Sequence, residues 1–295
     1  MSAQTQKAAL RDAVARAFVF ACEEELRAPK PGNVHIFAAG HRMSARDFFD
    51  SAKAAAGPLT QAGASVGARI LGAVEATRAR VGQNTNLGII LLCAPLVQAV
   101  LDGDGADDLP LRAQKVLCAL GADDAALAFR AIALANPAGL GAAARHDVLQ
   151  PARATLLEAM QEAAPRDRIA RQYASNYSDL FTIGFDALDR ARADRCDAPT
   201  TVLRLYLSFL SSFPDSHIAR KFGDRAAQDA MEQAGERAGF FFAARRLPEI
   251  EAKARAYDAE LKAGRLNPGT SADLTVAALF ADCLVRILAN AHKNG

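Results

Sequence analysis

Residues 200–213, TTVLRLYLSFLSSF, carry apolar side chains around the whole circumference of a predicted helix. A helix that is apolar on every side is normally buried among other elements, whereas a surface helix is apolar on one side only. We therefore predict that this helix lies at the centre of the core and that other helices surround it.

The rest of the chain favours the same type of secondary structure. Alanine, leucine and arginine dominate, tryptophan is absent, and the alternation typical of strands is hard to find. Apolar residues recur at helical spacing near both ends of the chain. Pro, Gly, Asp and Ser residues bound further predicted helices near 45–56, 59–79, 86–101, 111–119, 123–135, 147–163, 166–192, 224–246 and 248–263. The turn-rich breaks between them are typical of loops, so we predict an all-α, single-domain, multi-helix globule over residues 1–295.

Composition excludes several classes of function. The net charge of +2 is too small to predict binding to nucleic acid or to an anionic membrane. The most apolar run, 88–101, is about fourteen residues long and contains Pro95, whereas a membrane span needs about twenty. We expect that run to form a buried helix. The five cysteines show no C-x-x-C pair and the N-terminus has no continuous apolar region of a signal peptide, which favours a reduced, cytoplasmic protein.

The common nucleotide and zinc motifs do not explain this sequence. The P-loop pattern is absent, and residues 139–144 match the dinucleotide pattern G-x-G-x-x-A but follow no predicted strand. We interpret residues 139–144 as a loop. The five histidines are far apart in sequence, so no zinc site is predicted.

Four polar, turn-forming segments stand out from the alanine-rich background. They are KPGNVH at 30–35, QNTNLG at 83–88, DSHIARK at 215–221 and NPGTSAD at 267–273. Helix starts follow the second and fourth segments, and the third opens a helical turn, so free backbone N–H groups there could bind anions. Gly32 and Gly269 would let the backbone approach a ligand closely, and the cations Lys30, Arg220 and Lys221 suit phosphate.

Each segment alone is also typical of an ordinary helix cap or turn, and Asp273 in a first turn is favoured by the helix dipole alone. Glu23, Glu24 and Glu25 are typical of a solvated face, although one of them could turn toward Lys30. Only the co-occurrence of the four segments predicts a site. A site requires them to converge, so we predict that one cleft between helix ends is lined by Lys30, Asn84, Asp215, Lys221 and Ser271. Free N–H groups of the helices that begin near Asn86 and Ala272 would point into it.

At these segments the sequence resembles the triphosphoribosyl-dephospho-CoA synthase family, which makes the prosthetic-group precursor of citrate lyase and malonate decarboxylase. The resemblance covers nearly the whole chain. Its motifs are Pro-Lys-Pro-Gly, here 29–32 with Glu24 upstream; Asn-Thr-x-x-Gly, here Asn84, Thr85 and Gly88; Asp-Ser with a following basic pair, here Asp215, Ser216, Arg220 and Lys221; and Pro-Gly-x-Ser-Ala-Asp-Leu, here 268–274.

The resemblance implies a transferase in cofactor biosynthesis that joins the ribose 2′-hydroxyl of 3′-dephospho-CoA to C1′ of the ATP ribose and expels adenine. An oxocarbenium-like transition state would need a carboxylate near C1′, for which the candidates are Asp215 or Glu24, with Asp273 as a third. Mg²⁺, held by Asp215 and Glu24, would bridge to the triphosphate. The two polyanionic substrates would contact Lys30, Gly32, Asn33, Asn84, Thr85, Asn86, Ser216, Arg220, Lys221, Asn267, Gly269, Thr270 and Ser271. The resemblance is also compatible with a homo-oligomer.

Three departures from the family pattern keep alternatives open. His35 stands where better-known members have an acidic residue, Asn86-Leu87 where they have a His-Lys pair, and 266–270 reads LNPGT where they have Cys-Ser-Pro-Gly-Gly. At these positions the sequence resembles a divergent branch of the family that is found among archaea and one-carbon-metabolising bacteria. Such a protein could use another phosphorylated acceptor, as in tetrahydromethanopterin or methanofuran synthesis, or bind nucleotide in an assembly without catalysis. If the chain is catalytic, Asp215→Asn should abolish turnover and change the melting temperature by only a few degrees.

Overall fold

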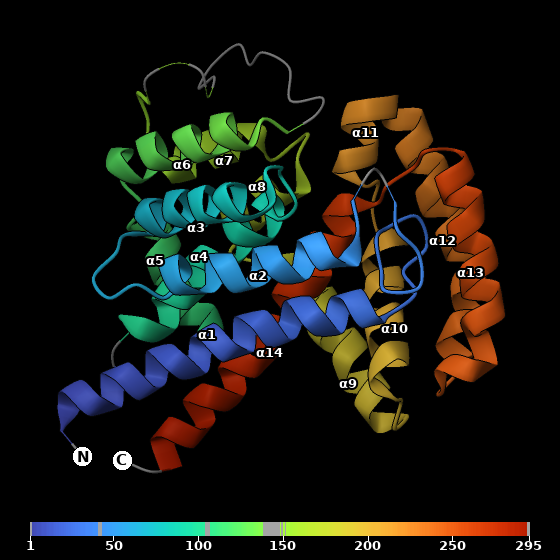
Figure 1. Cartoon of the computed structure of the whole chain (residues 1–295), viewed down its shortest axis with the longest axis horizontal. Coiled ribbons are helices and arrows are strands. Elements are labelled where there is room, and N and C mark those ends of the chain that lie inside the picture. The colour runs from blue at the N-terminus through green and yellow to red at the C-terminus, as the bar shows by residue number, and fades with distance from the viewer. Residues whose placement is uncertain are drawn as a thin grey trace. The chain divides into compact units, whose positions relative to one another are not determined.

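The computed structural model describes residues 2–40, 43–103, 107–137, 148, 150 and 152–293. Within these ranges the chain is all-α, and extended pairing is limited to the isolated bridges His35–Ala38 and Gly40–Met43. The helices are α1 Ala3–Arg27, α2 Ala45–Leu59, α3 Val66–Val81, α4 Leu87–Leu101, α5 Leu109–Cys118, α6 Ala122–Ala135, α7 Leu156–Ala163, α8 Arg168–Ala174, the π-helix η1 Leu180–Gly184, α9 Phe185–Ala193, α10 Ala198–Leu210, α11 Ser216–Phe222, α12 Asp224–Ala243, α13 Leu247–Ala263 and α14 Gly269–Lys293 (Figure 1). The dinucleotide-like stretch 139–144, His41 and His146 lie outside the described residues.

Two compact units make up the chain. Unit 1 comprises Met1–Ala21, Phe49–Ser178 and Leu279–Gly295, and unit 2 comprises Cys22–Phe48 and Asp179–Ala278. Boundaries fall inside α1, α2 and α14, so each of these helices contributes to both units. This division does not test the single-domain prediction, which stays a prediction.

The central helix of unit 2 is α10, as the apolar stretch predicts. Leu203, Leu205, Leu207 and Phe209 have no exposed surface, although they lie on different sides of the helix. Side chains of α12, α13 and the start of α14 pack into the same core cluster. The burial of α10 on all sides therefore confirms the fold expected from residues 200–213.

Unit 1 is built around a second buried helix, α4, which corresponds to the apolar run expected in the core. Pro95 interrupts its hydrogen bonding because proline has no N–H to donate to the carbonyl of Leu91. The buried Tyr173 hydroxyl donates to the Leu91 carbonyl at 2.6 Å, and the Tyr177 hydroxyl donates to the Leu92 carbonyl at 2.7 Å. These two bonds join α4 to α8 and to the segment that follows it.

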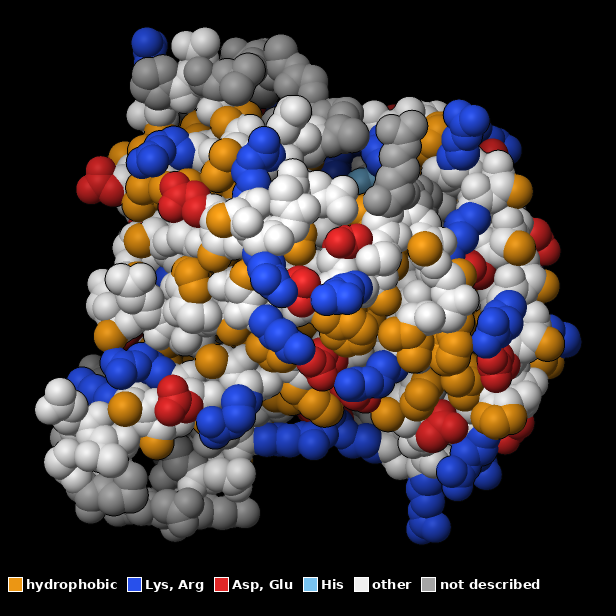
Figure 2. Space-filling model, in the orientation of Figure 1, with side chains coloured by type: hydrophobic (Ala, Val, Ile, Leu, Met, Phe, Trp, Pro, Cys, Tyr) orange, Lys and Arg blue, Asp and Glu red, His pale blue; other side chains and the backbone are white. Residues whose placement is uncertain are grey.

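The apolar faces of the two terminal helices meet in unit 1. The Phe18 ring of α1 meets the Phe280 ring of α14 edge to face, with the ring centroids 5.8 Å apart. No helix among the described residues is both long enough and apolar enough to cross a membrane. The view in Figure 2 shows Lys and Arg side chains interspersed with Asp and Glu, in agreement with the near-zero net charge.

Three predicted helices differ from the structure. The helix expected at 59–79 begins only at Val66, because Ser65 caps it and a turn containing Gly63 at φ +68° precedes it. The helix expected at 166–192 is broken where Asn176 and Tyr177 adopt positive φ values of 53° and 58°. The helix expected at 147–163 begins at Leu156, after a capping box at its start. Local propensity did not reveal these breaks, since polar caps and a tertiary tyrosine contact determine them.

Candidate functional site

Asp215 connects the starts of two helices in unit 2. Its Oδ1 accepts hydrogen bonds from the backbone N–H groups of His217 and Ile218 at 2.9 and 3.2 Å, in the first turn of α11. Its Oδ2 accepts from both the backbone N–H and the hydroxyl of Ser271 in α14, each at 2.8 Å. The side chain is completely buried. The anion that the sequence predicts at these helix starts is therefore, in this structure, the chain's own carboxylate.

The pKa of Asp215 is raised, because burial opposes ionisation more strongly than its hydrogen bonds from Ser271, Ile218 and His217 favour it. In α14 the N–H of Ala272 donates to the Pro268 carbonyl at 3.2 Å. The expectation of free N–H groups near Ala272 is thus corrected, since the first groups of α14 have protein acceptors.

The segments that contain Asp215 and Ser271 make further contacts. The hydroxyls of Ser216 and Thr270 are 3.0 Å apart, and the Thr270 hydroxyl also accepts from the His217 N–H at 3.2 Å. A Cβ at Gly269 would lie only 3.0 Å from Nδ1 of His217. A side chain here would crowd the His217 ring, so glycine favours the close approach of α11 and α14.

The turn at 30–35 packs against the same part of unit 2. Gly32 has φ +80°, and a Cβ there would lie 2.8 Å from Cδ of Pro268 and 3.0 Å from the Leu266 carbonyl oxygen. Its N–H donates to Oδ1 of Asp258 at 2.9 Å. Only glycine combines this backbone conformation with this close approach, which explains the Pro-Gly pair in the sequence.

Side chains extend this connection between the turn and the start of α14. Nδ2 of Asn33 donates to Oδ1 of Asn267 at 2.8 Å, and both residues are buried. The buried Tyr206 hydroxyl of α10 donates to the Pro31 carbonyl at 2.6 Å. Three of the four polar segments, up to about 240 residues apart, thus form one cluster, which we call the unit 2 cluster: residues 30–35, 215–221 and 267–273.

Lys30 lies inside this cluster, although the sequence suggested a phosphate ligand. Its ammonium group is completely buried and lies 3.1 Å from Oε1 of Glu25. It also donates to the carbonyls of Glu25 and Val34 at 2.8 and 2.9 Å. Burial lowers the pKa of Lys30 and raises that of Glu25, and the attraction between them offsets part of each shift. These contacts favour a structural role for Lys30, and they identify Glu25 as the member of the acidic triplet that turns inward.

Asp258 of α13 contacts the unit 2 cluster, and the sequence did not indicate this role. Its Oδ2 lies 3.3 Å from Nε2 of His35 and 2.8 Å from Nζ of Lys262. Burial raises the pKa of Asp258, but its interactions with His35 and Lys262 outweigh that effect and hold the pKa below its usual value. Burial lowers the pKa of His35 against the opposing effect of Asp258. The sequence feature that could have indicated Asp258 is its position between Tyr257 and Leu261, where a charged residue lies on the apolar side of a predicted helix.

The remaining predicted residues of unit 2 are more accessible. Glu24 is partly exposed and pairs with Arg27 at 2.5 Å, and Asp273 is partly buried in the second turn of α14. Arg220 is partly buried and Lys221 is exposed, both on α11. Partial burial is the larger cause that lowers the pKa of Lys221, and the positive charge of Arg220 is the smaller one. Of these groups, the cations Arg220 and Lys221 have the charge that suits a polyanion.

The fourth polar segment lies in unit 1. Oδ1 of Asn84 accepts from the Leu87 N–H at 3.2 Å, and the Thr85 hydroxyl lies 2.6 Å from the Ser51 hydroxyl. Asn86 occupies the N-cap position of α4 without a side-chain capping bond. These residues belong to a different unit from the unit 2 cluster, so one cleft shared by all four segments stays a prediction.

The residues named for Mg²⁺ do not fit a direct metal site. Both oxygens of Asp215 are buried and each accepts two protein hydrogen bonds, while Glu24 pairs with Arg27. Within the described part of the chain, no three His, Cys, Asp or Glu side chains form a group that could hold a metal ion. The structure therefore gives no support to Asp215 as a metal ligand.

Comparison with known proteins agrees with the motifs. A crystal structure from Archaeoglobus fulgidus, provisionally named a triphosphoribosyl-dephospho-CoA synthase, has a similar fold with a TM-score of 0.59. It is 24% identical to this chain, and the match covers 78% of this chain and 95% of that one. A search of curated proteins found no match. The family model described as ATP:dephospho-CoA triphosphoribosyl transferase matches residues 11–291, and the chain therefore belongs to this transferase family.

Proposed function

We propose that this chain transfers the triphosphoribosyl group of ATP to dephospho-CoA and releases adenine. The observation that carries the proposal is the unit 2 cluster, in which three of the four polar segments that contain the family motifs are joined by direct hydrogen bonds. The match to the family model over residues 11–291 supports the same reaction. Ordinary caps would not require such distant segments to meet.

In this reaction the bond between C1′ of the ATP ribose and N9 of adenine breaks. A bond forms between C1′ and the ribose 2′-oxygen of dephospho-CoA, whose hydroxyl proton is lost while adenine gains a proton. Positive charge develops on the ribose as in glycoside hydrolysis, so a carboxylate near C1′ stabilises the transition state. A positioned acid or base contributes about 10²- to 10⁴-fold.

Solvent access favours Glu24 and Asp273 for these roles. Asp215 is completely buried and has four donors, so we assign it as a positioning residue that fixes the starts of α11 and α14. Glu24 and Asp273 are partly accessible and lie near the ends of the elements that the cluster joins. Either carboxylate can then face C1′ while the other takes part in proton transfer.

The accessible cations Arg220 and Lys221 are the proposed contacts of unit 2 for substrate phosphates. Mg²⁺ would arrive bound to the triphosphate of ATP, as part of the substrate. Use of ATP, together with five cysteines that form no disulfide bond, favours a cytoplasmic location.

The test is a chromatographic assay for free adenine after incubation of the full chain with ATP, Mg²⁺ and dephospho-CoA. Glu24→Gln should lower the rate of adenine release by about 10²-fold or more, the effect of losing a positioned carboxylate. Glu23→Gln is the matched control, because Glu23 is the neighbouring residue and pairs with the same Arg27 at 3.1 Å. The control should retain nearly the full rate.

Three other outcomes would contradict parts of the proposal. Equal rates for the two variants would exclude Glu24 from the chemistry. Consumption of ATP without adenine would indicate another transfer reaction and another acceptor. Absence of any turnover would favour a nucleotide-binding protein without catalysis.

A further inference from the structure

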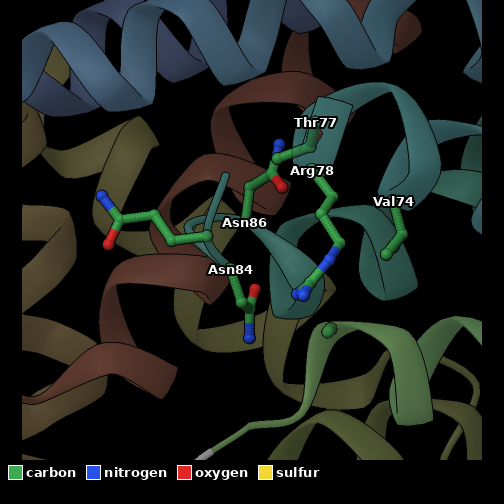
Figure 3. A pocket seen from close by; sticks show the side chains of 7 residues that line it. Val74, Thr77, Arg78, Asn84 and Asn86 are labelled. Atoms are coloured by element: carbon green, nitrogen blue, oxygen red, sulfur yellow. The ribbon is translucent and has the colours of Figure 1, made fainter. Parts of the chain in front are cut away.

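A small hollow in unit 1 lies beside the start of α4 (Figure 3). Its lining includes Thr77 and Arg78 of α3, Asn84 and Asn86 before α4, and Ala135 at the end of α6. The hollow has room for about one oxygen-sized group. Its lining contains no Asp or Glu, so the polar groups around it favour a neutral or negatively charged occupant.

Two of the lining side chains are buried polar groups without a partner. The Thr77 hydroxyl and Nδ2 of Asn86 make no hydrogen bond, although the residues are only 3% and 5% exposed. A buried helical threonine normally donates to a carbonyl one turn earlier, as Thr275 does to Ser271 at 2.8 Å in α14. Thr60, directly after α2, donates in the same way to Ala56 at 2.9 Å. Leaving such groups unpaired costs stability, so both are available to donate to an acceptor atom that enters the hollow.

The surroundings of these two groups are electropositive. Helix α4 has fifteen residues and begins here, and the first-turn N–H groups of Gly88 and Ile89 have no acceptor within the helix. Arg78 lies at the rim, and one of its five donors binds the Leu134 carbonyl at 3.0 Å. In Figure 3 the Arg78 side chain extends toward Asn84, while Thr77 and Asn86 lie together at the other side.

We propose that this hollow binds an oxygen of a phosphoryl group in the triphosphate substrate. The oxygen accepts from Thr77 and Asn86, and the rest of the phosphoryl group remains at the rim near Arg78. Assigning this group to ATP rests on the proposed function. The binding of a triphosphate at this hollow does not rest on the proposed function, and it can be measured without turnover.

Isothermal titration of the full chain with inorganic triphosphate tests the site. Thr77→Val keeps the side-chain shape and removes the hydroxyl, so it should raise Kd by about tenfold or more. The melting temperature without ligand should not fall, because the lost hydroxyl has no protein partner. Thr60→Val is the matched control: it should leave Kd unchanged and lower the melting temperature, because it removes the bond to Ala56.

Asn86→Asp provides a second test that a structural role would not predict. Asp and Asn are equally good helix caps, and a negative charge suits a helix start, so a purely capping role predicts an unchanged Kd. A carboxylate beside the phosphoryl oxygen should instead abolish measurable binding of triphosphate. Circular dichroism confirms that the variant is folded.

The outcomes separate this site from the proposed reaction. Unchanged Kd in either variant, or no binding of triphosphate by the wild-type chain, would overturn the site. If adenine is released but Thr77→Val binds triphosphate as tightly as wild type, the site is wrong and the reaction stands. If binding depends on Thr77 but no adenine is released, the site stands and the reaction is wrong.

Discussion

Replacing Asp215 by Asn should destabilise the protein, in contrast to the small effect expected from the sequence alone. The amide of Asn can still accept from the His217 and Ile218 N–H groups through its oxygen. Its NH₂ group would then face the Ser271 N–H, which now donates to Oδ2 at 2.8 Å. Two donors would oppose each other at a completely buried position.

The size of the effect follows from these contacts. Leaving a buried donor without an acceptor costs about 1–3 kcal/mol, and the loss of bonds to a charged group adds to that cost. We therefore expect Asp215→Asn to lower the free energy of unfolding by about 3 kcal/mol. For a chain of this length that corresponds to a fall in Tm of about 5 °C.

Thermal unfolding followed by circular dichroism measures this change. Asp108→Asn is the matched control, because Asp108 is an exposed N-cap whose carboxylate accepts from the Leu111 N–H at 3.0 Å. Asn caps a helix as well as Asp does, so the control should lose no more than a few tenths of a kcal/mol. If Asp215→Asn and Asp108→Asn unfold at the same temperature, the positioning role of Asp215 is refuted.

Three further predictions concern the unit 2 cluster. Burial lowers the pKa of His35, so the unfolded chain binds a proton on His35 more readily than the folded chain does. The contribution of His35 to the free energy of unfolding should be complete above the unfolded pKa of about 6.5 and fall as the pH drops below it. Urea unfolding at pH 5–7.5 should show that His35→Gln removes part of this dependence of stability on pH. Gly32→Ala should cost at least about 2 kcal/mol more than Gly63→Ala, since both have positive φ but only the former Cβ meets neighbouring atoms, and equal costs in chemical denaturation would exclude a close approach. Tyr206→Phe removes the donor to the Pro31 carbonyl and should cost about 1–2 kcal/mol by the same assay; no loss would show that this bond does not hold the turn.

Much of the fold could be predicted because its cause is local. The all-round apolar pattern of residues 200–213 indicated a buried helix, and α10 is buried on all sides. The motif glycines predicted a close approach of the backbone to a ligand. The structure shows Gly32 and Gly269 close to other parts of the chain, and the ligand stays a prediction. Patterns that act through burial or backbone conformation can be interpreted from the sequence because they constrain each position by itself.

The partners of charged groups could not be predicted in the same way. The sequence predicted Lys30 as a phosphate ligand, but in the structure its ammonium group contacts the Glu25 carboxylate and two backbone carbonyls. The sequence predicted Asp215 as a catalytic carboxylate. In the structure four hydrogen bonds hold its carboxylate, and two of the donors come from the start of α14, more than fifty residues later. The sequence did not indicate Asp258, because two of its partners, Gly32 and His35, come from the turn at 30–35. Such roles depend on tertiary contacts, and sequence spacing does not encode them.

Mass spectrometry of the products formed by the full chain from ATP and dephospho-CoA tests the central proposal most directly. We predict one new compound with the combined mass of dephospho-CoA and the triphosphoribosyl group, formed in equal amounts with free adenine. Formation of ADP or AMP without adenine, with no triphosphoribosyl group on the dephospho-CoA, would contradict the proposed reaction.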